Sequence, residues 1–481
     1  RLVDWAVRSV DNATSAMKST LFRFPRPAPL DGVLPRTFST ATEALTWLDV
    51  ERANLVALVA HAVERDPENS PWQLADALRG YFYTQSLTAE WRETAKAGLL
   101  GARAPRDELG QLAMLSSLGT LYWVTGQHRN ALGYYQQAIA LQEHIDLPEA
   151  EAAVLSNAGS VYIDLGELEH AADHLERALV IARRNGAFQV QANALFNLGG
   201  VYMQLGQLDR AATTFEEALE AGTRIDSWIT QANSMRALGE VHAWRGRPDL
   251  GASYFVRASE LYERAAARNF GHTQHEGLAI TLIMRGRYDE AAVEASLAMQ
   301  IAQDLENAKS VCDAQNLLGR ALEGAGRLDE AIEQFSSALA IAQETGYSWG
   351  TCSARRGLAS AYRGAGRYEE ALTTATSALV EAGRSQFRLA EMEVLLVLGR
   401  THLDTADAAG ALECALRASA VGSDSGHRWV YGRALQLAGD ASAALGSVDE
   451  ARGYWASSLE VFSSIGTPEA VVVRAQLEVT T

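Results

Sequence analysis

A spacing of 40 residues recurs along most of this 481-residue chain. Small residues repeat at this step in a first series of Gly119, Gly159, Gly199, Gly239, Ala279, Gly319, Ala359, Gly399 and Gly439. A second series keeps the same step at Ala131, Ala171, Ala211, Gly251, Ala291, Ala331, Ala371, Ala411 and Ala451. Both series run without an insertion or deletion. A repeat of this length predicts a solenoid, in which each unit packs on its neighbours and the array lengthens unit by unit.

Residues 192–218 show what one unit contains. Their apolar and small residues follow a helical period up to Gly206, which ends the first helix, and Asp209 opens a second helix. Gly199 belongs to the first helix and Phe215 to the second. A glycine at a helix crossing lets the two backbones approach, and an aromatic ring fills the space beside it. The sequence therefore predicts one helical hairpin per repeat.

The order of residue types in a unit resembles the tetratricopeptide repeat. The first helix carries a large apolar residue, a small residue and then Tyr, and the second carries Ala, an aromatic residue and Ala, as in Leu198-Gly199-Tyr202 followed by Ala211-Phe215-Ala218. The family's usual repeat is near ~34 residues, so about six extra residues lengthen the helices here. The resemblance implies an all-α, right-handed superhelix of about ten helical hairpins. Because such arrays mostly bind peptides or proteins, it also implies binding rather than catalysis.

The pattern divides the chain into four segments. Thr40 and Glu43 form a capping box that opens a helix, and Pro71 is expected at the first position of the next one. Trp91 stands 40 residues before Ala131 and marks a degenerate first repeat. We expect an N-terminal helix and Pro-rich linker at 1–36, a helical adaptor with the degenerate repeat at 37–111, nine repeats at 112–466 and a capping helix at 467–481. The capping helix, expected from Pro468 to Val479, should cover apolar surface around Leu437, Trp455 and Leu459.

Net charge and cysteine content limit the classes of partner that the chain can bind and the cellular compartment in which it works. The net charge is −17, and an acidic chain repels phosphate backbones, which argues against direct nucleic-acid binding. No apolar run approaches the ~20 residues that cross a bilayer. The three cysteines, Cys312, Cys352 and Cys414, lack the spacing of metal ligands. Cys312 and Cys352 lie one repeat apart, and equivalent atoms of stacked helices are roughly 10 Å apart, which is too far for a disulfide. These features predict a reducing, cytoplasmic location without membrane association.

A second resemblance is carried by residues 46–64, TWLDVERANLVALVAHAVE. This segment resembles the one that leads into the repeats of actinobacterial AfsR-like regulators. In that family a DNA-binding SARP domain and an NB-ARC ATPase of the STAND class precede C-terminal repeats. Residues 1–22 resemble the helix that follows the winged-helix part of the ATPase. The resemblance implies a sensor region that receives a signal and controls ATPase oligomerisation, in the regulation of antibiotic biosynthesis. Because the chain begins at Arg1 inside an expected helix, we expect it to be a piece of a longer protein.

Other functions remain open at this point. A stand-alone scaffold or a peptide-pheromone receptor would carry the same repeats with no ATPase upstream. An enzyme built on the solenoid would need a catalytic constellation, and no such motif is found. The lysines are Lys18, Lys96 and Lys309, and none follows a Gly-rich phosphate-binding turn. We therefore expect no enzyme activity, no nucleotide and no other cofactor in this chain.

Two histidine pairs have helical spacing. His170 and His174 are four residues apart, and His272 and His275 are three apart. Two histidines on one helical face can share a metal, yet no third ligand accompanies either pair. The first pair also stands among glutamates typical of a solvated face. We predict no metal site.

The concave surface is the candidate binding site. In the resembling fold the first helix of each hairpin lines this surface, with the second, fifth, sixth and ninth positions of a repeat, counted from 112, pointing inward. Those positions carry Asn157, Asn193, Asn197, Asn233, Arg236, Asn316, Arg320 and Arg356, and continue at Arg400 and Arg433. Amides can pair with the peptide groups of an extended ligand, and arginines can hold carboxylates. The sequence predicts a groove for a peptide or protein segment, with the ATPase and DNA-binding domains of a full-length protein as further partners. The alternative is that polar residues merely tolerate exposure there.

Overall fold

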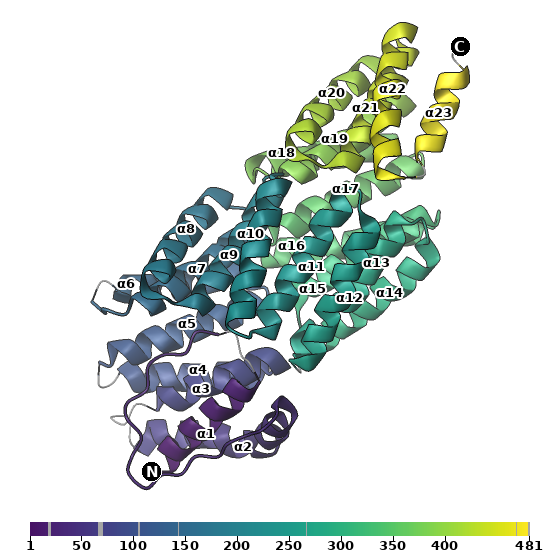
Figure 1. Cartoon of the computed structure of the whole chain (residues 1–481). Helices are drawn as coiled ribbons and strands as arrows, with labels where there is room; N and C mark the ends of the chain where they lie inside the picture. Colours follow the sequence, from purple (N-terminus) through teal and green to yellow (C-terminus); the bar gives the residue numbers. More distant parts are fainter. Residues whose placement is uncertain are drawn as a thin grey trace.

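Helices make up all the regular secondary structure that the computed structural model describes, in residues 1–17, 21–65, 71–103, 106–142, 144–265, 267–467 and 469–479. The N-terminal part contains α1(Leu2–Ala16), α2(Ala41–Arg65), α3(Trp72–Gln85) and α4(Thr88–Arg103). The hairpins that follow are α5(Glu108–Val124) with α6(His128–Gln142), α7(Pro148–Asp164) with α8(Leu168–Asn185), α9(Phe188–Gln204) with α10(Leu208–Arg224), α11(Trp228–Trp244) with α12(Pro248–Arg264), α13(Thr273–Met284) with α14(Tyr288–Asp304), α15(Ala308–Gly324) with α16(Leu328–Thr345), α17(Ser348–Gly364) with α18(Tyr368–Arg384), α19(Arg388–Asp404) with α20(Ala408–Ser425), and α21(Arg428–Ala444) with α22(Val448–Ile465). The last helix is α23(Glu469–Val479). The predicted all-α array of helical hairpins is confirmed (Figure 1).

The repeated glycines lie where the two helices of a hairpin cross. A Cβ built on Gly199 would stand 2.6 Å from the ring of Phe215, and one on Gly319 would stand 2.7 Å from the ring of Phe335. Both rings are almost completely buried. Carbon atoms pack at about 3.5–4.0 Å, so the crossing has no room for a side chain. The pairing of a small residue with an aromatic one therefore sets the distance between the helices of a hairpin.

The turns inside the hairpins require a left-handed backbone. Gly206 has a φ of +73° between α9 and α10, and glycine recurs there in most hairpins. In the eighth hairpin Ala406 takes this position with a φ of +63°. The left-handed region costs a residue with a Cβ about 1–2 kcal/mol, so this turn is strained.

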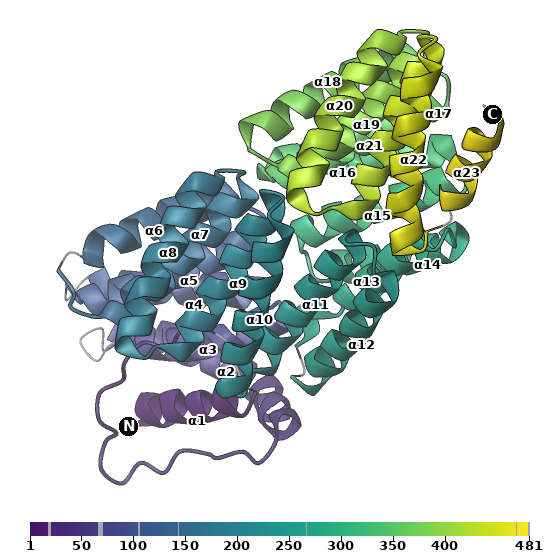
Figure 2. The ribbon, with the colours of Figure 1, turned by 45° about the horizontal axis from the view of Figure 1, so that its top comes forward.

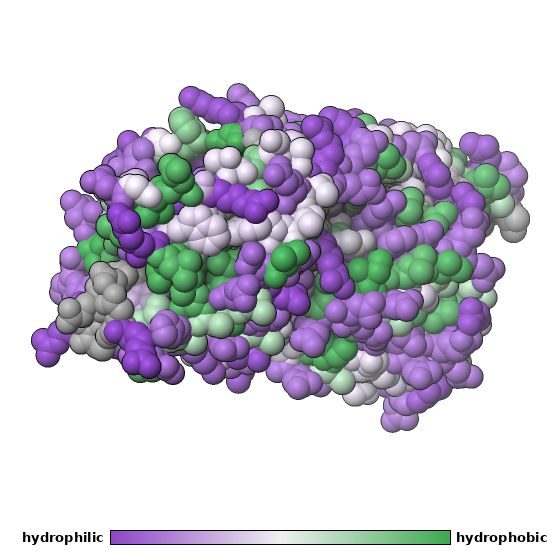
Figure 3. Space-filling view, turned by 90° about the horizontal axis from the view of Figure 1, so that it is seen from below, coloured by the Kyte–Doolittle hydropathy of each residue, from purple (hydrophilic) through white to green (hydrophobic). Residues whose placement is uncertain are grey.

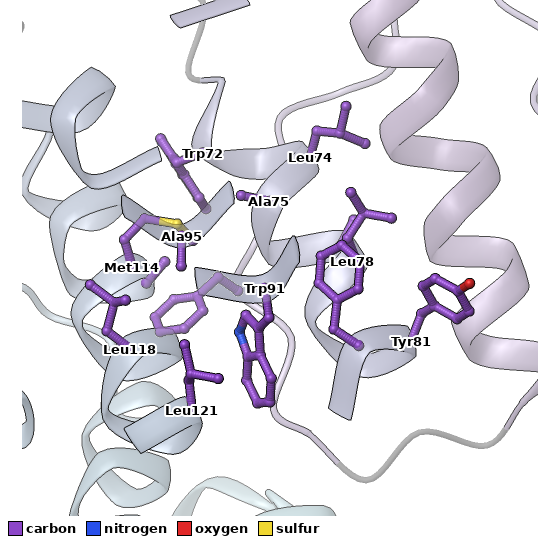
Figure 4. Close-up of a cluster of buried hydrophobic side chains, with 14 of the residues drawn as sticks. Trp72, Leu74, Ala75, Leu78, Tyr81, Trp91, Ala95, Met114, Leu118 and Leu121 are labelled. Atoms are coloured by element: carbon purple, nitrogen blue, oxygen red, sulfur yellow. The ribbon is translucent and has the colours of Figure 1, made fainter. Parts of the chain in front are cut away.

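The N-terminal segments continue the array. In the capping box, the Glu43 backbone N–H donates to Thr40 Oγ1 at 3.1 Å, and Glu43 Oε2 accepts from the Ser39 backbone N–H at 3.0 Å. Trp91 is buried at the second-helix alanine position and donates from Nε1 to Ser117 Oγ at 2.8 Å. Figure 4 shows Trp91 among apolar side chains from α3, α4 and α5. The degenerate hairpin thus shares a core with the first regular one.

Two local features differ from the expectations drawn from the sequence, and two expected positions lie outside the residues that the structure describes. Pro71 is the N-cap of α3 rather than its first helical residue. Helix α13 is shorter than its equivalents, because a 3-10 turn, η2(Arg268–Phe270), precedes it and stacks Phe270 on Tyr262 with ring centroids 4.7 Å apart. The expected start of the last helix, Pro468, lies outside the described residues, as does Lys18.

The last helix packs on the ninth regular hairpin. Val473 of α23 is completely buried in a cluster with Trp455, and Leu459 packs against the same cluster. Leu437, which was also expected beneath this helix, is buried in a different cluster formed with α19 and its neighbours. Helix α23 therefore covers the second helix of the hairpin more than the first.

Segments more than five repeats apart lie side by side. His128 Nδ1 is 2.8 Å from the Thr345 carbonyl oxygen, and Gln386 Nε2 donates to Glu169 Oε1 at 2.9 Å; each pair is separated by 217 residues. Figures 1 and 2 show hairpins α5–α10 beside the later hairpins, with the two chain termini at opposite ends. Successive coils of the solenoid therefore touch, and the concave face encloses a space.

Candidate functional site: the interior hollow

A hollow of about 840 Å³ lies inside the array. Its wall comes mainly from the first helices of consecutive hairpins, α11, α13, α15, α17, α19 and α21. Helix α15 contributes Lys309, Asp313, Asn316 and Arg320, which are separated by four, three and four residues. This spacing places the four side chains on one stripe of a helix. The volume lies within the ~300–1,000 Å³ typical of small-molecule and cofactor pockets.

One part of the hollow is rich in carboxylates. Arg236 and Glu240 of α11 form an ion pair. Burial raises the pKa of Glu276 to about 8, and the carboxylate of Asp313 acts in the same direction. Burial also raises the pKa of Glu240, although the positive charge of Arg236 opposes the shift. The positive charges in this part of the wall therefore do not fully offset the effect of burial on Glu240 and Glu276.

Lys309 neutralises part of this negative charge. Its Nζ lies 3.2 Å from Asp313 Oδ2 and donates to Tyr347 Oη at 3.0 Å. Tyr347 Oη in turn donates to Asp313 Oδ1 at 3.1 Å. Although burial lowers the pKa of Lys309, the carboxylate of Asp313 holds it well above its ordinary value. The three side chains form a fixed polar cluster that links α15 to the start of α17.

Arginines dominate another part of the wall. Arg356 Nε lies 3.3 Å from Glu393 Oε2, and Arg400 Nη1 lies 2.5 Å from Asp440 Oδ2. Arg320 and Arg433 have neither a carboxylate within 4.0 Å nor a hydrogen-bond acceptor in the described part of the chain. Burial lowers the pKa of Arg320, and the nearby guanidinium of Arg356 lowers it further. Burial lowers the pKa of Arg433 as well, and the guanidinium of Arg400 lowers it further.

Glu393 is the carboxylate around which these cations gather. Burial raises its pKa, but the charges of Arg356, Arg320 and Arg433 bring it below its ordinary value. These arginines come from three different helices, α17, α15 and α21. The solenoid curvature therefore concentrates positive charge at one place, in a chain whose net charge is −17.

Aromatic rings complete the wall. The guanidinium of Arg433 lies over the ring of Trp429, 4.8 Å from its centroid, and Trp429 Nε1 donates to Glu469 Oε1 at 2.9 Å. Trp244 stacks on His427 with ring centroids 5.9 Å apart. Burial lowers the pKa of His427 to about 4, so this imidazole is neutral at pH 7. The hollow thus offers flat apolar surfaces between its charged groups.

A family comparison follows from this architecture. The model of the MalT-like TPR region matches residues 80–349, more than half of the chain. The chain belongs to the MalT-like TPR family. A tetratricopeptide-repeat model also matches residues 353–375, and a comparison with curated proteins found no match.

Solved structures share the fold of this MalT-like TPR array. A Rap protein complexed with Competence and Sporulation Factor superposes with a TM-score of 0.56 at 15% identity, over 74% of this chain and 99% of the Rap chain. The Rap conjugation gene regulator of plasmid pLS20, in complex with the Phr* peptide, superposes with a TM-score of 0.52 at 15% identity, over 69% of this chain and 96% of the regulator chain. A STAND protein with a tetratricopeptide repeat sensor from Pyrococcus horikoshii gives 0.46 at 15% identity over 72% and 53%, which is too low to carry an argument. At these identities the likeness concerns the fold alone.

Half of the residues predicted for the groove of this MalT-like TPR array line the hollow. These are Arg236, Asn316, Arg320 and Arg356, joined by Arg400 and Arg433. The other four are not part of its lining: Asn157, Asn193, Asn197 and Asn233. Asn233 Oδ1 accepts a hydrogen bond from Tyr262 Oη at 2.5 Å, and Asn193 Oδ1 accepts one from Gln189 Nε2 at 3.4 Å. The amide ladder is therefore not one continuous surface of the hollow, and ligand contact by any of the eight residues stays a prediction.

Several lining residues were not singled out from the sequence. They are chiefly Glu240, Glu276, Asp313, Tyr347, Glu393 and Trp429. A signal for some of them was present, because Asp313 and Glu393 lie at multiples of 40 residues from Asn193. The repeat position therefore marked the inward stripe. It did not show which repeats curve around the hollow.

The remaining candidate sites have simpler structural roles. His170 is exposed and lies 3.2 Å from Glu167, and His275 Nδ1 lies 2.7 Å from Glu294 Oε2. In the described residues, no group of three or more potential ligands could hold a metal ion. Among the described helices, we find no candidate for a membrane-spanning segment. The described cysteines are buried and unpaired: Cys312, Cys352 and Cys414.

A second, more open depression of about 680 Å³ lies between residues 37–42 and the start of α11. Hydroxyl and amide side chains and one arginine, Arg264, provide its polar lining. Arg264 lies over the ring of Trp228, 4.7 Å from its centroid. Figure 3 shows that hydrophilic side chains cover most of one outer face, with apolar ones in separate islands. The interior hollow is less open than this depression and has more charged side chains in its lining, so it is the stronger candidate site.

Proposed function

We propose that this array is the sensor-regulatory arm of a STAND-type transcriptional regulator, which receives a peptide or a protein segment in the interior hollow. Ligand binding would then control whether the ATPase of the same protein oligomerises. The observation that carries the proposal is the partly open hollow, whose wall combines accessible arginines, carboxylates and flat aromatic rings. Such a surface suits a ligand with both charged groups and apolar side chains.

Two further features support this regulator. The chain belongs to the MalT-like TPR family, whose repeats form concave binding surfaces. Residues 46–64, which resemble the segment preceding the repeats of AfsR-like regulators, fall within α2. In this proposal α1 and α2 connect the ATPase to the array, and the ATPase and DNA-binding domains are its intramolecular partners.

A stand-alone peptide receptor is the second candidate. It is favoured by the likeness to two Rap structures, one in complex with Competence and Sporulation Factor and the other with the Phr* peptide. The same hollow would hold the ligand, but no ATPase would respond. The coding sequence upstream of Arg1 distinguishes the candidates: a phosphate-binding GxxxxGK[ST] motif and a winged helix support the regulator, and their absence refutes it.

The hollow itself is tested by filling it. Ser353 lies on the inward stripe of α17, and Ser353→Trp would occupy part of the hollow. Ser336 is exposed on α16, and Ser336→Trp is the matched outer control. Affinity purification from the source cell should recover a partner with the wild type and with Ser336→Trp but not with Ser353→Trp. Recovery with Ser353→Trp and loss with Ser336→Trp would place binding on the convex side and refute the proposal.

A further inference from the structure

Two arginines in the hollow carry charges that the protein does not neutralise by direct contact. Arg320 and Arg433 lack a carboxylate within 4.0 Å, whereas Arg356 and Arg400 each have one. The carboxylates of Glu393, Glu323 and Glu469 attract them without such a contact. Both residues are half-buried, and a cation that is partly removed from water is ordinarily paired, because desolvation is costly.

The donors of these arginines remain accessible from the hollow. Neither side chain has a polar atom that is both sealed from solvent and unbonded, although several other buried polar groups do. A guanidinium presents five N–H donors in one plane. The contact of Arg433 with the Trp429 ring uses none of its N–H groups as a hydrogen-bond donor to an oxygen. An edge with free N–H groups matches the two oxygens of a carboxylate or a phosphate.

The two side chains also line the same hollow, as does Glu393. The charges of Arg320 and Arg433 both lower the pKa of this carboxylate. They come from α15 and α21, two helices on either side of α17 and α19. Trp349 and Trp429 lie in the same wall and provide apolar surface beside the charges.

We infer that Arg320 and Arg433 form an oxyanion-binding site, which holds a carboxylate or phosphate group of the ligand. The inference rests on the proposed function for the location of the ligand and names the chemistry that the hollow selects. Within a peptide, the oxyanion would be an acidic side chain or the terminal carboxylate. Binding relieves the repulsion that Arg356 and Arg400 exert on the two free guanidinium groups.

Simple anions test this site without knowledge of the natural ligand. The thermal unfolding midpoint is measured in millimolar sodium succinate or inorganic phosphate, with sodium chloride adjusted to hold ionic strength constant. The variants are Arg320→Gln/Arg433→Gln and a control pair of exposed arginines on outer helices, Arg184→Gln/Arg452→Gln. Circular dichroism checks that each variant keeps its helical content.

We expect at least one anion to raise the midpoint of the wild type and of the control pair saturably, and the rise to be lost in Arg320→Gln/Arg433→Gln. A larger effect of succinate assigns the site to carboxylates, and a larger effect of phosphate assigns it to phosphate groups.

Two results would overturn the inference: no rise beyond that in chloride, or an equal rise in the double variant. Neither affects the Ser353→Trp experiment, so the proposed peptide site can survive the loss of the oxyanion site. Conversely, a saturable anion effect would support the oxyanion site even if Ser353→Trp still recovers every partner that the wild type recovers. That second result would refute the peptide proposal.

Discussion

Neighbouring glycines in α9 allow a sharp test of the helix-crossing argument. A Cβ at Gly199 would stand 2.6 Å and 2.7 Å from two ring carbons of Phe215, whereas a Cβ at Gly200 would meet nothing within 4 Å. Both positions are helical, so Gly→Ala gains a similar helix propensity of about 1 kcal/mol at each. The difference between Gly199→Ala and Gly200→Ala therefore isolates the crossing.

The magnitude follows from the space that the methyl group needs. Carbon contacts at 2.6 Å must open by about 1 Å to reach an ordinary packing distance. Phe215 is 1% exposed and its ring packs 5.8 Å from that of Phe196, so it has little room to yield. Overpacking of this kind costs about 1–3 kcal/mol. Gly200→Ala should thus stabilise the array, and Gly199→Ala should be less stable than Gly200→Ala by about 1–3 kcal/mol.

Urea unfolding followed by circular dichroism measures the difference. The midpoint and slope should be compared together, because long repeat arrays can unfold in more than one step. Gly199→Leu should cost more than Gly199→Ala, since its side chain is larger. Equal midpoints for Gly199→Ala and Gly200→Ala would show that the glycine-to-aromatic contact does not set the hairpin spacing.

Three further predictions follow from single features. Ala406→Gly should raise the thermal midpoint by relieving about 1 kcal/mol of left-handed strain; an unchanged or lower midpoint would contradict this. Because the folded state raises the pKa of Glu276 to about 8 from 4.5, it binds a proton that the unfolded chain releases, so this group's contribution to stability falls as the pH rises from about 4.5 to about 8. Glu276→Gln should lessen that fall, and identical pH profiles of the thermal midpoint for wild type and variant would exclude the linkage. Deleting α23 should uncover Trp455 and promote self-association, measured by size-exclusion chromatography; a monodisperse truncated chain would refute its capping role.

The site was only partly predictable from the sequence. Arg320, Arg356 and Asn316 occupy predicted inward positions and line the hollow. Asn197 occupies an equally inward position in the counting, yet it is not part of the lining. The two residues differ in their place along the solenoid, because the hollow is formed mainly by hairpins from α11 onward. The repeat pattern is the same in all hairpins and does not mark that place.

The sequence by itself determined the repeating unit. The 40-residue step, the glycine opposite an aromatic ring and the turn glycines are local features, and each acts within one hairpin or between neighbours. The capping box at Thr40 is local in the same sense. Such features can be read from spacing and residue type because the physical partner is always close in sequence.

Only the tertiary structure decided how the hairpins curve and which charges meet. The small rotation between successive hairpins accumulates along the array and brings His128 to Thr345, 217 residues later. The same accumulation gathers Arg320, Glu393 and Arg433 around one space. No single repeat contains that information, because the curvature is the sum of many helix contacts. Whether a charge in the hollow is paired depends on the final distances between side chains from distant repeats.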